Sequence, residues 1–186
     1  VDTKLFKHNS NIKKKYDILF IGRLDIQKNL NNLLEALVGL SLNILFIGKG
    51  KLKNMVLDYK KEYNLDLELI EMVSNEKLPR YMNSAKIYIL PSLAEGNPKT
   101  LLEAMACQMP VIGSNVPGIS NIIMHNVNGM ICDTTINGIR QSINDLYNNV
   151  VLQNRIAKNA RKYILKHCSL DIIVKKEFKV YNNILN

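Results

Sequence analysis

Tryptophan is absent from this sequence of 186 residues, and no hydrophobic run approaches the length of a membrane-spanning helix, about eighteen residues. The first ten residues, VDTKLFKHNS, lack the apolar core of a secretory signal. Hydrophobic residues make up 47% of the chain and charged residues 22%, an ordinary composition for a globular protein. We therefore predict a cytoplasmic globular protein with one sizeable hydrophobic core.

Cysteine is scarce, with only Cys107, Cys132 and Cys168, which lie far apart in the chain. An odd number of cysteines and the absence of a CxxC pair argue against both a disulfide framework and a zinc site. The sequence thus predicts reduced thiols, as in the cytosol, and no metal centre built on cysteine.

Acidic residues are fewer than basic ones: the chain has 16 aspartates and glutamates and 25 lysines and arginines, for a net charge of +9. Such a surplus attracts nucleic acid, acidic lipid or nucleotides. The lysines are scattered outside short runs such as 13–15, however, which favours a solvated surface for most of them. With no tryptophan and few other aromatic residues to stack on bases, we predict no nucleic-acid partner.

One expected helix groups five cations on one side, and two interpretations of that side stay open. The cations are Arg155, Lys158, Arg161, Lys162 and Lys166. A solvated face is the simpler interpretation. The alternative is peripheral contact with anionic lipid headgroups at the inner face of a membrane.

Strand-like and helix-like segments alternate along the first two thirds of the chain. The strand-like segments are nearly continuous hydrophobic runs, which indicates burial on both faces, as in a parallel sheet covered by helices. They lie at 16–24, 42–50, 67–73, 86–92, 110–115 and 129–133. Helical spacing is found at 28–40, 52–64, 75–85, 99–108 and 119–124, and again at 135–149, 151–168 and 170–185.

This order predicts an α/β fold: a doubly wound, mainly parallel sheet of six strands flanked by helices, with further helices at the C-terminus. No linker rich in glycine, serine or proline divides the chain, and no internal repeat is found. We therefore assign residues 1–186 to one domain.

Ligands of open parallel sheets bind at the carboxyl ends of the strands. Glycines and charged residues are concentrated at these positions, which fits an anionic ligand. The candidates are Gly22, Arg23 and Lys28; Gly48, Lys49 and Gly50; Val73 and Ser74; Ser92, Glu95 and Gly96; and Gly113 and Ser114. The GKG at 48–50 matches only the first half of a dinucleotide-binding GxGxxG motif, and a tight turn explains its glycines at least as well.

The stretch EGNPKTLLEAM at 95–105 places two acids around the expected start of a helix. Asn97 is a good helix N-cap and Pro98 suits the first helical position. The free amide groups near Lys99 and Thr100 would then favour a phosphate. Spacing alone leaves Glu103 open between a solvated charge and a ligand contact, for which an acid that binds ribose hydroxyls is a precedent.

Several motifs together carry a resemblance to a known family. They are VDTKLF at 1–6, FIGRLDIQKNLNNLLEAL at 20–37, the segment from VSNEKLPRYM to VPGISNII at 73–123, and NGMICD at 128–133. The chain resembles the C-terminal, donor-binding domain of a retaining GT-B glycosyltransferase of family 4, the "glycosyl transferases group 1" domain. Seven residues separate Glu95 from Glu103, as the family's E-x7-E motif requires.

The resemblance implies a role for each matching residue. Arg23 and Lys28 would stabilise the diphosphate of a nucleotide sugar as it leaves, Glu95 would contact hydroxyls of the transferred sugar, and Glu103 would accept hydrogen bonds from the ribose. Further donor-binding residues implied by the match are Gly22, Val73, Ser74, Gly96, Asn97, Pro98, Lys99 and Thr100. Cations and a helix terminus can stabilise a leaving diphosphate, so we expect no cofactor and no essential metal.

Some residues depart from the family pattern. Asn97 and Lys99 replace bulkier or smaller apolar residues of many members, Asn121 stands where an acid is common, and Gln108 replaces a frequent glycine. The sequence begins in a segment that resembles the family's interdomain hinge, so the N-terminal domain that would bind a sugar or lipid-linked acceptor is absent. We expect this chain to bind a UDP- or GDP-linked sugar and to transfer little or none of it alone.

Two other classes of function remain. The first is a non-catalytic nucleotide- or sugar-binding module of the same fold; the presence of Arg23, Lys28, Glu95 and Glu103 together argues against it. The second is a GT-B-like epimerase or phosphorylase, but no lysine is marked for the pyridoxal phosphate that such a phosphorylase needs. A nucleophilic triad is not indicated either, because no histidine has a partner at a suggestive spacing.

Overall fold

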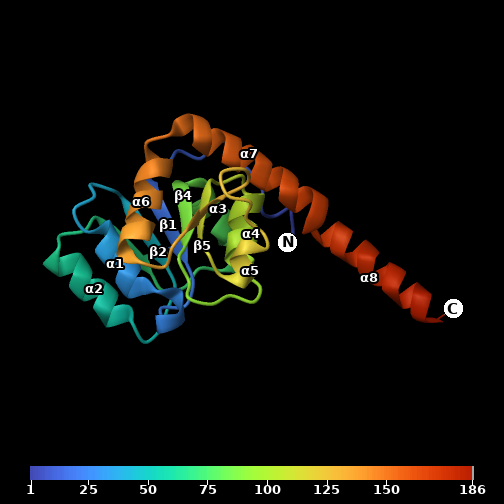
Figure 1. The fold of residues 1–186 in the computed structure, drawn as a ribbon, viewed down its shortest axis with the longest axis horizontal. Helices are drawn as coiled ribbons and strands as arrows, with labels where there is room; N and C mark the ends of the chain where they lie inside the picture. The colour runs from blue at the N-terminus through green and yellow to red at the C-terminus, as the bar shows by residue number, and fades with distance from the viewer. Residues whose placement is uncertain (186) are drawn as a thin grey trace.

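A six-stranded parallel sheet forms the centre of the computed structural model, which describes the backbone of residues 1–185 and the side chains of residues 1–181 (Figure 1). The strands follow the order β3-β2-β1-β4-β5-β6. Their bounds are β1 Tyr16–Ile21, β2 Ile44–Ile47, β3 Leu67–Ile70, β4 Ala85–Leu90, β5 Val111–Ser114 and β6 Met130–Cys132. The predicted fold class is confirmed, and every strand pair is parallel.

The hydrophobic runs form the central strands because these strands are covered on both faces. All six residues of β1 are buried. In the register of the sheet, Ile18 of β1 pairs with Ile44 of β2 on one side and with Ile87 of β4 on the other. The edge strand β3 is only partly buried, and its shorter apolar segment fits that place.

The helices cover the sheet in two layers, as right-handed crossovers require. Helix α1 contacts α2 and α6 on one face, whereas α4 contacts α3 and α7 on the other. Their bounds are α1 Leu30–Leu37, α2 Lys53–Glu62, α3 Leu78–Asn83, α4 Lys99–Ala106, α5 Pro117–Ser120, α6 Ile136–Tyr147, α7 Val150–His167 and α8 Leu170–Leu185, with short 3-10 turns η1 Ile26–Lys28 and η2 Asn75–Lys77.

Two helical predictions need correction. The helix expected at 119–124 is the shorter α5, which begins at Pro117, a residue favoured at the first helical position. The helix expected at 28–40 is interrupted by Asn29, whose left-handed backbone (φ 55°) separates η1 from α1. Asparagine tolerates this conformation better than most residues, and its side-chain amide donates to the carbonyl of Thr134.

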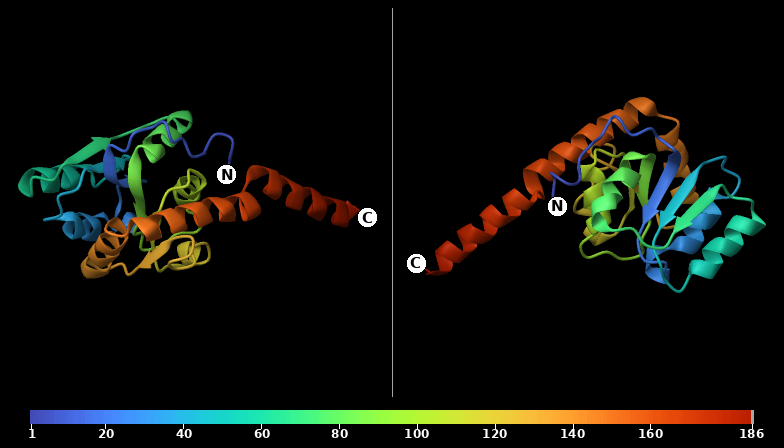
Figure 2. Two further views of the ribbon diagram at one scale, coloured as in Figure 1. Left: turned by 90° about the horizontal axis from the view of Figure 1, so that it is seen from above. Right: turned by 180° about the vertical axis from the view of Figure 1, so that it is seen from behind.

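The last two helices, α7 and α8, extend beyond the layers that cover the sheet. Helix α7 crosses the body, and α8 projects away from it, as both views in Figure 2 show. The chain's first residues lie beside the junction of the two helices: the Val1 amino group donates to the carbonyl of Cys168 at 2.7 Å. Arg161 donates to the carbonyls of Thr3, Phe6 and Ala106. Arg161 therefore holds the first segment on the body and does not belong to the exposed cations of α7.

All three cysteines are free thiols. Cys107 and Cys132 are buried, and burial raises the pKa of each to about 12. A thiol with such a pKa is a poor nucleophile, which fits a place in the hydrophobic core.

Candidate functional site

The strand order of the sheet reverses between β1 and β4, and the predicted site residues meet at the carboxyl ends of these two strands. In open α/β sheets, the crevice at such a switch point is where ligands bind. The loop after β1 carries Lys28, the loop after β4 carries Glu95, and helix α4 begins directly beyond the second loop.

Lys28 and Glu95 form an ion pair between the Lys28 ammonium and Glu95 Oε1. Both side chains are largely buried, with 14% of Lys28 and 8% of Glu95 exposed. The hydroxyl of Ser92 donates to the same carboxylate oxygen at 2.7 Å. Within the described part of the chain, no group donates a hydrogen bond to Oε2 of Glu95, so one oxygen of a well-held carboxylate is available to a ligand.

Two further contacts fix the loop that carries Glu95. The Ser114 hydroxyl, at the end of β5, donates to the carbonyl of Ser92 at 2.5 Å. Gly118 of α5 lies so close that a Cβ there would be 2.0 Å from the carbonyl oxygen of Glu95. The strand ends point to Ser92 and Ser114. Gly118 lies in the VPGISNII part of the family motif, but its role stays hidden in the sequence because its contact is with a residue 23 positions earlier.

Helix α4 presents its N-terminus to the switch point. Thr100 anchors this end: its hydroxyl donates to the carbonyl of Ile21 at 3.2 Å and lies 2.7 Å from the hydroxyl of Tyr88. The first amide groups of a helix have no carbonyl within the helix to pair with, so they carry partial positive charge. In α4 the Lys99 amide pairs instead with the Asn97 carbonyl, which leaves the amides from Thr100 onward for this role. This charge lies beside the Lys28–Glu95 pair.

The predicted cap of this helix is wrong. The helix begins at Lys99, Pro98 takes the cap position, and no side chain caps it. Asn97 and Gly96 are exposed in the preceding loop, where the Asn97 carbonyl accepts from the Lys99 amide at 2.9 Å. Pro98 restricts the backbone of Asn97 and takes the cap position itself. Asn97 therefore lies one residue before the cap and does not make the side-chain hydrogen bond of an N-cap asparagine.

An apolar cavity of about 240 Å³ lies beside the pair, at the carboxyl ends of β1, β2 and β3. Predicted residues Gly22, Arg23 and Val73 line it, whereas Ser74 is exposed outside the lining. Gly48 packs on Gly22 so closely that a Cβ would meet its carbonyl oxygen at 1.8 Å. The first glycine of GKG is therefore explained by the approach of β2 to β1, and the second, Gly50, by the carbonyl oxygen of Leu24, which a Cβ would meet at 2.3 Å.

Arg23 is far more accessible than Lys28, with 75% of its side chain exposed. Its Nε lies 3.3 Å from Oδ2 of Asp25. The guanidinium stands at the mouth of the apolar cavity and is free to turn towards an anion, because an exposed pair of this kind is weak.

Glu103 lies half-buried on α4, and burial raises the pKa of its carboxyl, an effect that the amino group of Val1 and the ammonium of Lys99 oppose. Burial raises the pKa of the Tyr88 hydroxyl, and the charges of Glu95 and Glu103 add to that effect. Glu103 does not line the apolar cavity, and no donor to its carboxylate is found within residues 1–181. The described residues thus give the Glu103 carboxylate neither a hydrogen-bond donor nor a contact with the Lys28–Glu95 pair.

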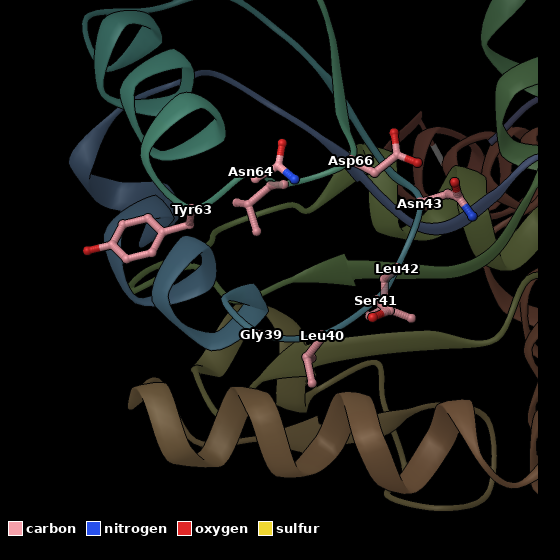
Figure 3. Close-up of a pocket in the computed structure, with 9 residues that line it drawn as sticks. Gly39, Leu40, Ser41, Leu42, Asn43, Tyr63, Asn64 and Asp66 are labelled. Carbon is pink, nitrogen blue, oxygen red and sulfur yellow. The ribbon is translucent and has the colours of Figure 1, made fainter.

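A cavity at the opposite edge of the sheet has a different character. It measures about 380 Å³ and lies between loops 39–43 and 63–66, at the amino ends of β2 and β3 (Figure 3). Asp66 is its one charged lining residue. It is separate from the switch point, where the predicted site residues meet.

Two structural findings bear on other predictions. In the part of the chain that the structure describes, no group of three or more His, Cys, Asp or Glu side chains is placed to hold a metal ion. Among the described helices, none is both long and apolar enough to cross a membrane.

Comparisons with known proteins identify relatives of this chain. An uncharacterized glycosyltransferase of Methanocaldococcus jannaschii is 29% identical over 80% of this chain and 43% of its own length. The Escherichia coli UDP-Gal:alpha-D-GlcNAc-diphosphoundecaprenol alpha-1,3-galactosyltransferase is 26% identical over 88% of this chain and 48% of its own length. The chain therefore spans about half the length of the curated relatives it matches.

Among solved structures, Anabaena HepE in complex with UDP-glucose superposes with a TM-score of 0.87 at 16% identity, over 98% of this chain and 56% of that one. The fold is that of one Rossmann-like half of a GT-B glycosyltransferase. The profile of the family described as "Glycosyl transferases group 1" matches residues 1–163, and the chain belongs to this family of glycosyltransferases.

Proposed function

We propose that the chain is the donor-binding part of a retaining family 4 glycosyltransferase and binds a UDP- or GDP-linked sugar. The observation that carries this proposal is the buried Lys28–Glu95 pair with one free carboxylate oxygen, at the switch point and beside the start of α4. A cation, a helix N-terminus and a free carboxylate oxygen suit the diphosphate and the hydroxyls of a nucleotide sugar.

Positive charge at the site would stabilise the leaving group. When the glycosidic bond to the diphosphate breaks, negative charge grows on the phosphate oxygens. Lys28, Arg23 and the first amides of α4 are placed to stabilise that charge, and preorganised groups of this kind lower a barrier without reorganising. In our proposal they replace a metal, so transfer and binding proceed without one.

The diphosphate would compete with Glu95 for Lys28. In the free protein the Lys28 ammonium is paired with Glu95 Oε1. A bound diphosphate offers the same ammonium a second anion, and Glu95 then accepts hydrogen bonds from the sugar hydroxyls through Oε2. Ser92 keeps the carboxylate in place during this change, because its own bond does not involve the ligand.

The nucleoside would bind in the apolar cavity and against Glu103. The apolar cavity suits a flat base against Val73 and Gly22, and the carboxylate of Glu103 would accept hydrogen bonds from the ribose. A carboxylate without a protein donor gains most from such bonds, because charge-assisted hydrogen bonds are worth more than neutral ones.

The acceptor would bind outside the donor-binding domain formed by residues 1–186. The E. coli relative acts, by its name, on a diphosphoundecaprenol-linked sugar. We propose a sugar or lipid-linked acceptor here too, and a cytoplasmic enzyme with peripheral membrane contact. This chain alone would bind the donor and transfer no sugar.

Calorimetry with UDP, GDP, ADP and their sugars, with and without EDTA, tests the proposal. We expect one base to be preferred and EDTA to leave its binding unchanged. Arg23→Ala should weaken diphosphates about tenfold, because a charged contact is worth 1.5–3 kcal/mol, and should leave nucleosides unaffected. Glu103→Ala should weaken every ligand with the ribose.

Lys166→Ala is the matched control, because Lys166 is an exposed cation on α7. Equal binding by the wild type, both site variants and the control would refute the site. Sugar transfer by the isolated chain would refute the assignment of the acceptor to another domain.

A further inference from the structure

The loops after β1 and β4 are joined by Gln27, a residue of neither the ion pair nor the apolar cavity. Its side-chain Nε2 donates to the carbonyl of Ala94 at 2.9 Å. Its own backbone carbonyl accepts from the amide of Leu93 at 2.8 Å. One residue thus contacts two consecutive residues of the facing loop, across 66 positions of sequence.

The position of this contact relates it to the site. Gln27 immediately precedes Lys28, and Ala94 immediately precedes Glu95. The contact at 27 and 93–94 therefore fixes the register in which Lys28 faces Glu95. Ser92, on the other side of the contact, adds its hydrogen bond to the same carboxylate.

We propose that Gln27 is a positioning residue that couples the diphosphate-binding loop to the sugar-binding loop. The inference rests on the proposed function and deepens it. While Lys28 is paired with Glu95, the ion pair itself holds the two loops in register. Once a diphosphate engages Lys28, that restraint weakens, and the contacts of Gln27 keep Glu95 in reach of the sugar.

The role is divided between two groups of Gln27, and only one depends on the side chain. The bond from the Leu93 amide to the backbone carbonyl survives any substitution that preserves the backbone. The bond to Ala94 needs a donor at the end of a long side chain. Gln27→Ala removes the donor, Gln27→Glu keeps the length but lacks the donor, and Gln27→Lys restores a donor that reaches Ala94.

The proposal predicts a selective loss of sugar recognition. An exposed neutral hydrogen bond contributes about 0.5–1.5 kcal/mol, or about two- to twelvefold in a dissociation constant. We expect Gln27→Ala and Gln27→Glu to lower the affinity for UDP-glucose relative to UDP by about that factor. For Gln27→Ala, affinity for UDP itself should change less than twofold, because the change removes no charge. Gln27→Glu should also weaken UDP, because it adds an anion to the hollow that Gln27 shares with Arg23, so for this variant the ratio of the two affinities is the test.

Calorimetry with UDP and UDP-glucose on the full chain measures this ratio, and hydrogen exchange of the free chain measures the contact. In Gln27→Ala, the amides of 93–97 should exchange faster, and Gln27→Lys should restore both slow exchange and the UDP-glucose ratio. Gln141→Ala is the matched control, because Gln141 also donates an exposed amide bond, to Asp145 on α6 at 2.7 Å. Its ratio and exchange should equal those of the wild type.

The outcomes separate this inference from the proposed function. If the wild type binds neither ligand, the proposed function fails and the sugar-positioning role fails with it, while the exchange data still decide whether Gln27 joins the loops. If the wild type binds both and Gln27→Ala lowers both equally, or Gln27→Lys does not restore the ratio, the inference is wrong although the proposed function stands.

Discussion

Asp17 and Glu95 are both buried acids paired with a lysine, at opposite ends of the central strands. Asp17, at the start of β1, has 4% of its surface exposed and uses both oxygens: Lys86 and Tyr147 donate to Oδ1, and Asn43 donates twice to Oδ2. Glu95 uses Oε1 alone.

The difference separates a structural carboxylate from one available to a ligand. Burial acts to raise the pKa of Asp17, but hydrogen bonds from Lys86, Asn43 and Tyr147 outweigh it and hold the pKa below its ordinary value. Every acceptor position is filled by the protein, so Asp17 stabilises the fold. Lys28 and Ser92 hold the carboxylate of Glu95 through Oε1. Its Oε2 has no donor among the described residues, and sugar hydroxyls can supply one.

The largest expected effect is on stability, from Asp17→Ala. Its donors lose their acceptor, and those that cannot reach water cost about 1–3 kcal/mol each. Since Lys86 is half-exposed and regains water, we expect a total loss of about 2–3 kcal/mol in the free energy of unfolding, measured by urea titration. UDP affinity should be unchanged in the folded protein; a weaker affinity would contradict the separation of the two carboxylates.

The pH dependence of the same variant follows from the lowered pKa of Asp17. A carboxyl group whose pKa is lower in the folded state contributes stability above its unfolded pKa, ordinarily 3.8, and loses it as the pH falls through the folded pKa. The difference in stability between wild type and Asp17→Ala should therefore be largest near neutral pH and shrink below about pH 3.8.

Glu95→Gln should change ligand affinity, which Asp17→Ala leaves unchanged. The variant leaves the Lys28 ammonium without its anion, so the free chain loses stability. UDP then supplies an anion, so UDP should bind more tightly and raise the melting temperature more than in the wild type. The preference for UDP-glucose over UDP should fall about tenfold, since a charged acceptor contributes 1.5–3 kcal/mol. Unchanged preference would show that Glu95 does not contact the sugar.

Glu103→Gln sharpens the comparison, because Glu103 is a half-buried acid with no protein donor in the described chain. Burial raises its pKa above the ordinary 4.5, so the charged form destabilises the folded state at neutral pH. The variant should therefore be more stable than the wild type at pH 7, with the gain vanishing below about pH 4.5. Nucleoside affinity should nevertheless fall about fivefold, since a neutral acceptor replaces a charged one. Calorimetry and thermal melting over pH 4–8 measure both.

The smallest effect is expected at the amino edge of the sheet, from Gln108→Gly. Gln108 precedes β5 with a left-handed backbone, φ 59°, which costs a residue other than glycine about 1–2 kcal/mol. Glycine loses more chain entropy on folding, so the net gain should be about 0.5–1 kcal/mol, without a change in UDP affinity. Gln141→Gly, in the middle of α6, is the control and should lose about 1 kcal/mol.

The parts of the molecule that could be predicted are those set by local pattern. Continuous apolar runs predict the strands, because a strand buried on both faces has no polar side to display. The strand ends also predict that Lys28 and Glu95 lie at the same edge of the sheet. The left-handed conformation of Gln108 agrees with its departure from a glycine position.

The failed or missing predictions depend on contacts between distant residues. Asn97 has the right residue type for a cap, but Pro98 takes the cap position of α4, and no side chain caps the helix. Arg161 belongs by spacing to a basic helix side, and yet it binds carbonyls of the first segment and of α4. Gln27 and Gly118 lie inside motifs of the family resemblance, but the sequence assigns them no role, because each contacts a loop that is distant in the chain.

The sequence by itself determined the six-stranded parallel fold, the edge of the sheet where charge and glycine gather, and the family. These follow from hydrophobic periodicity and short motifs, which involve only neighbouring residues. Only the tertiary structure decided that Asp17 has all its acceptor positions filled and that Glu95 keeps one oxygen free. Hydrogen bonding of a buried carboxylate depends on donors from several strands and helices, and their meeting is a property of the packed molecule.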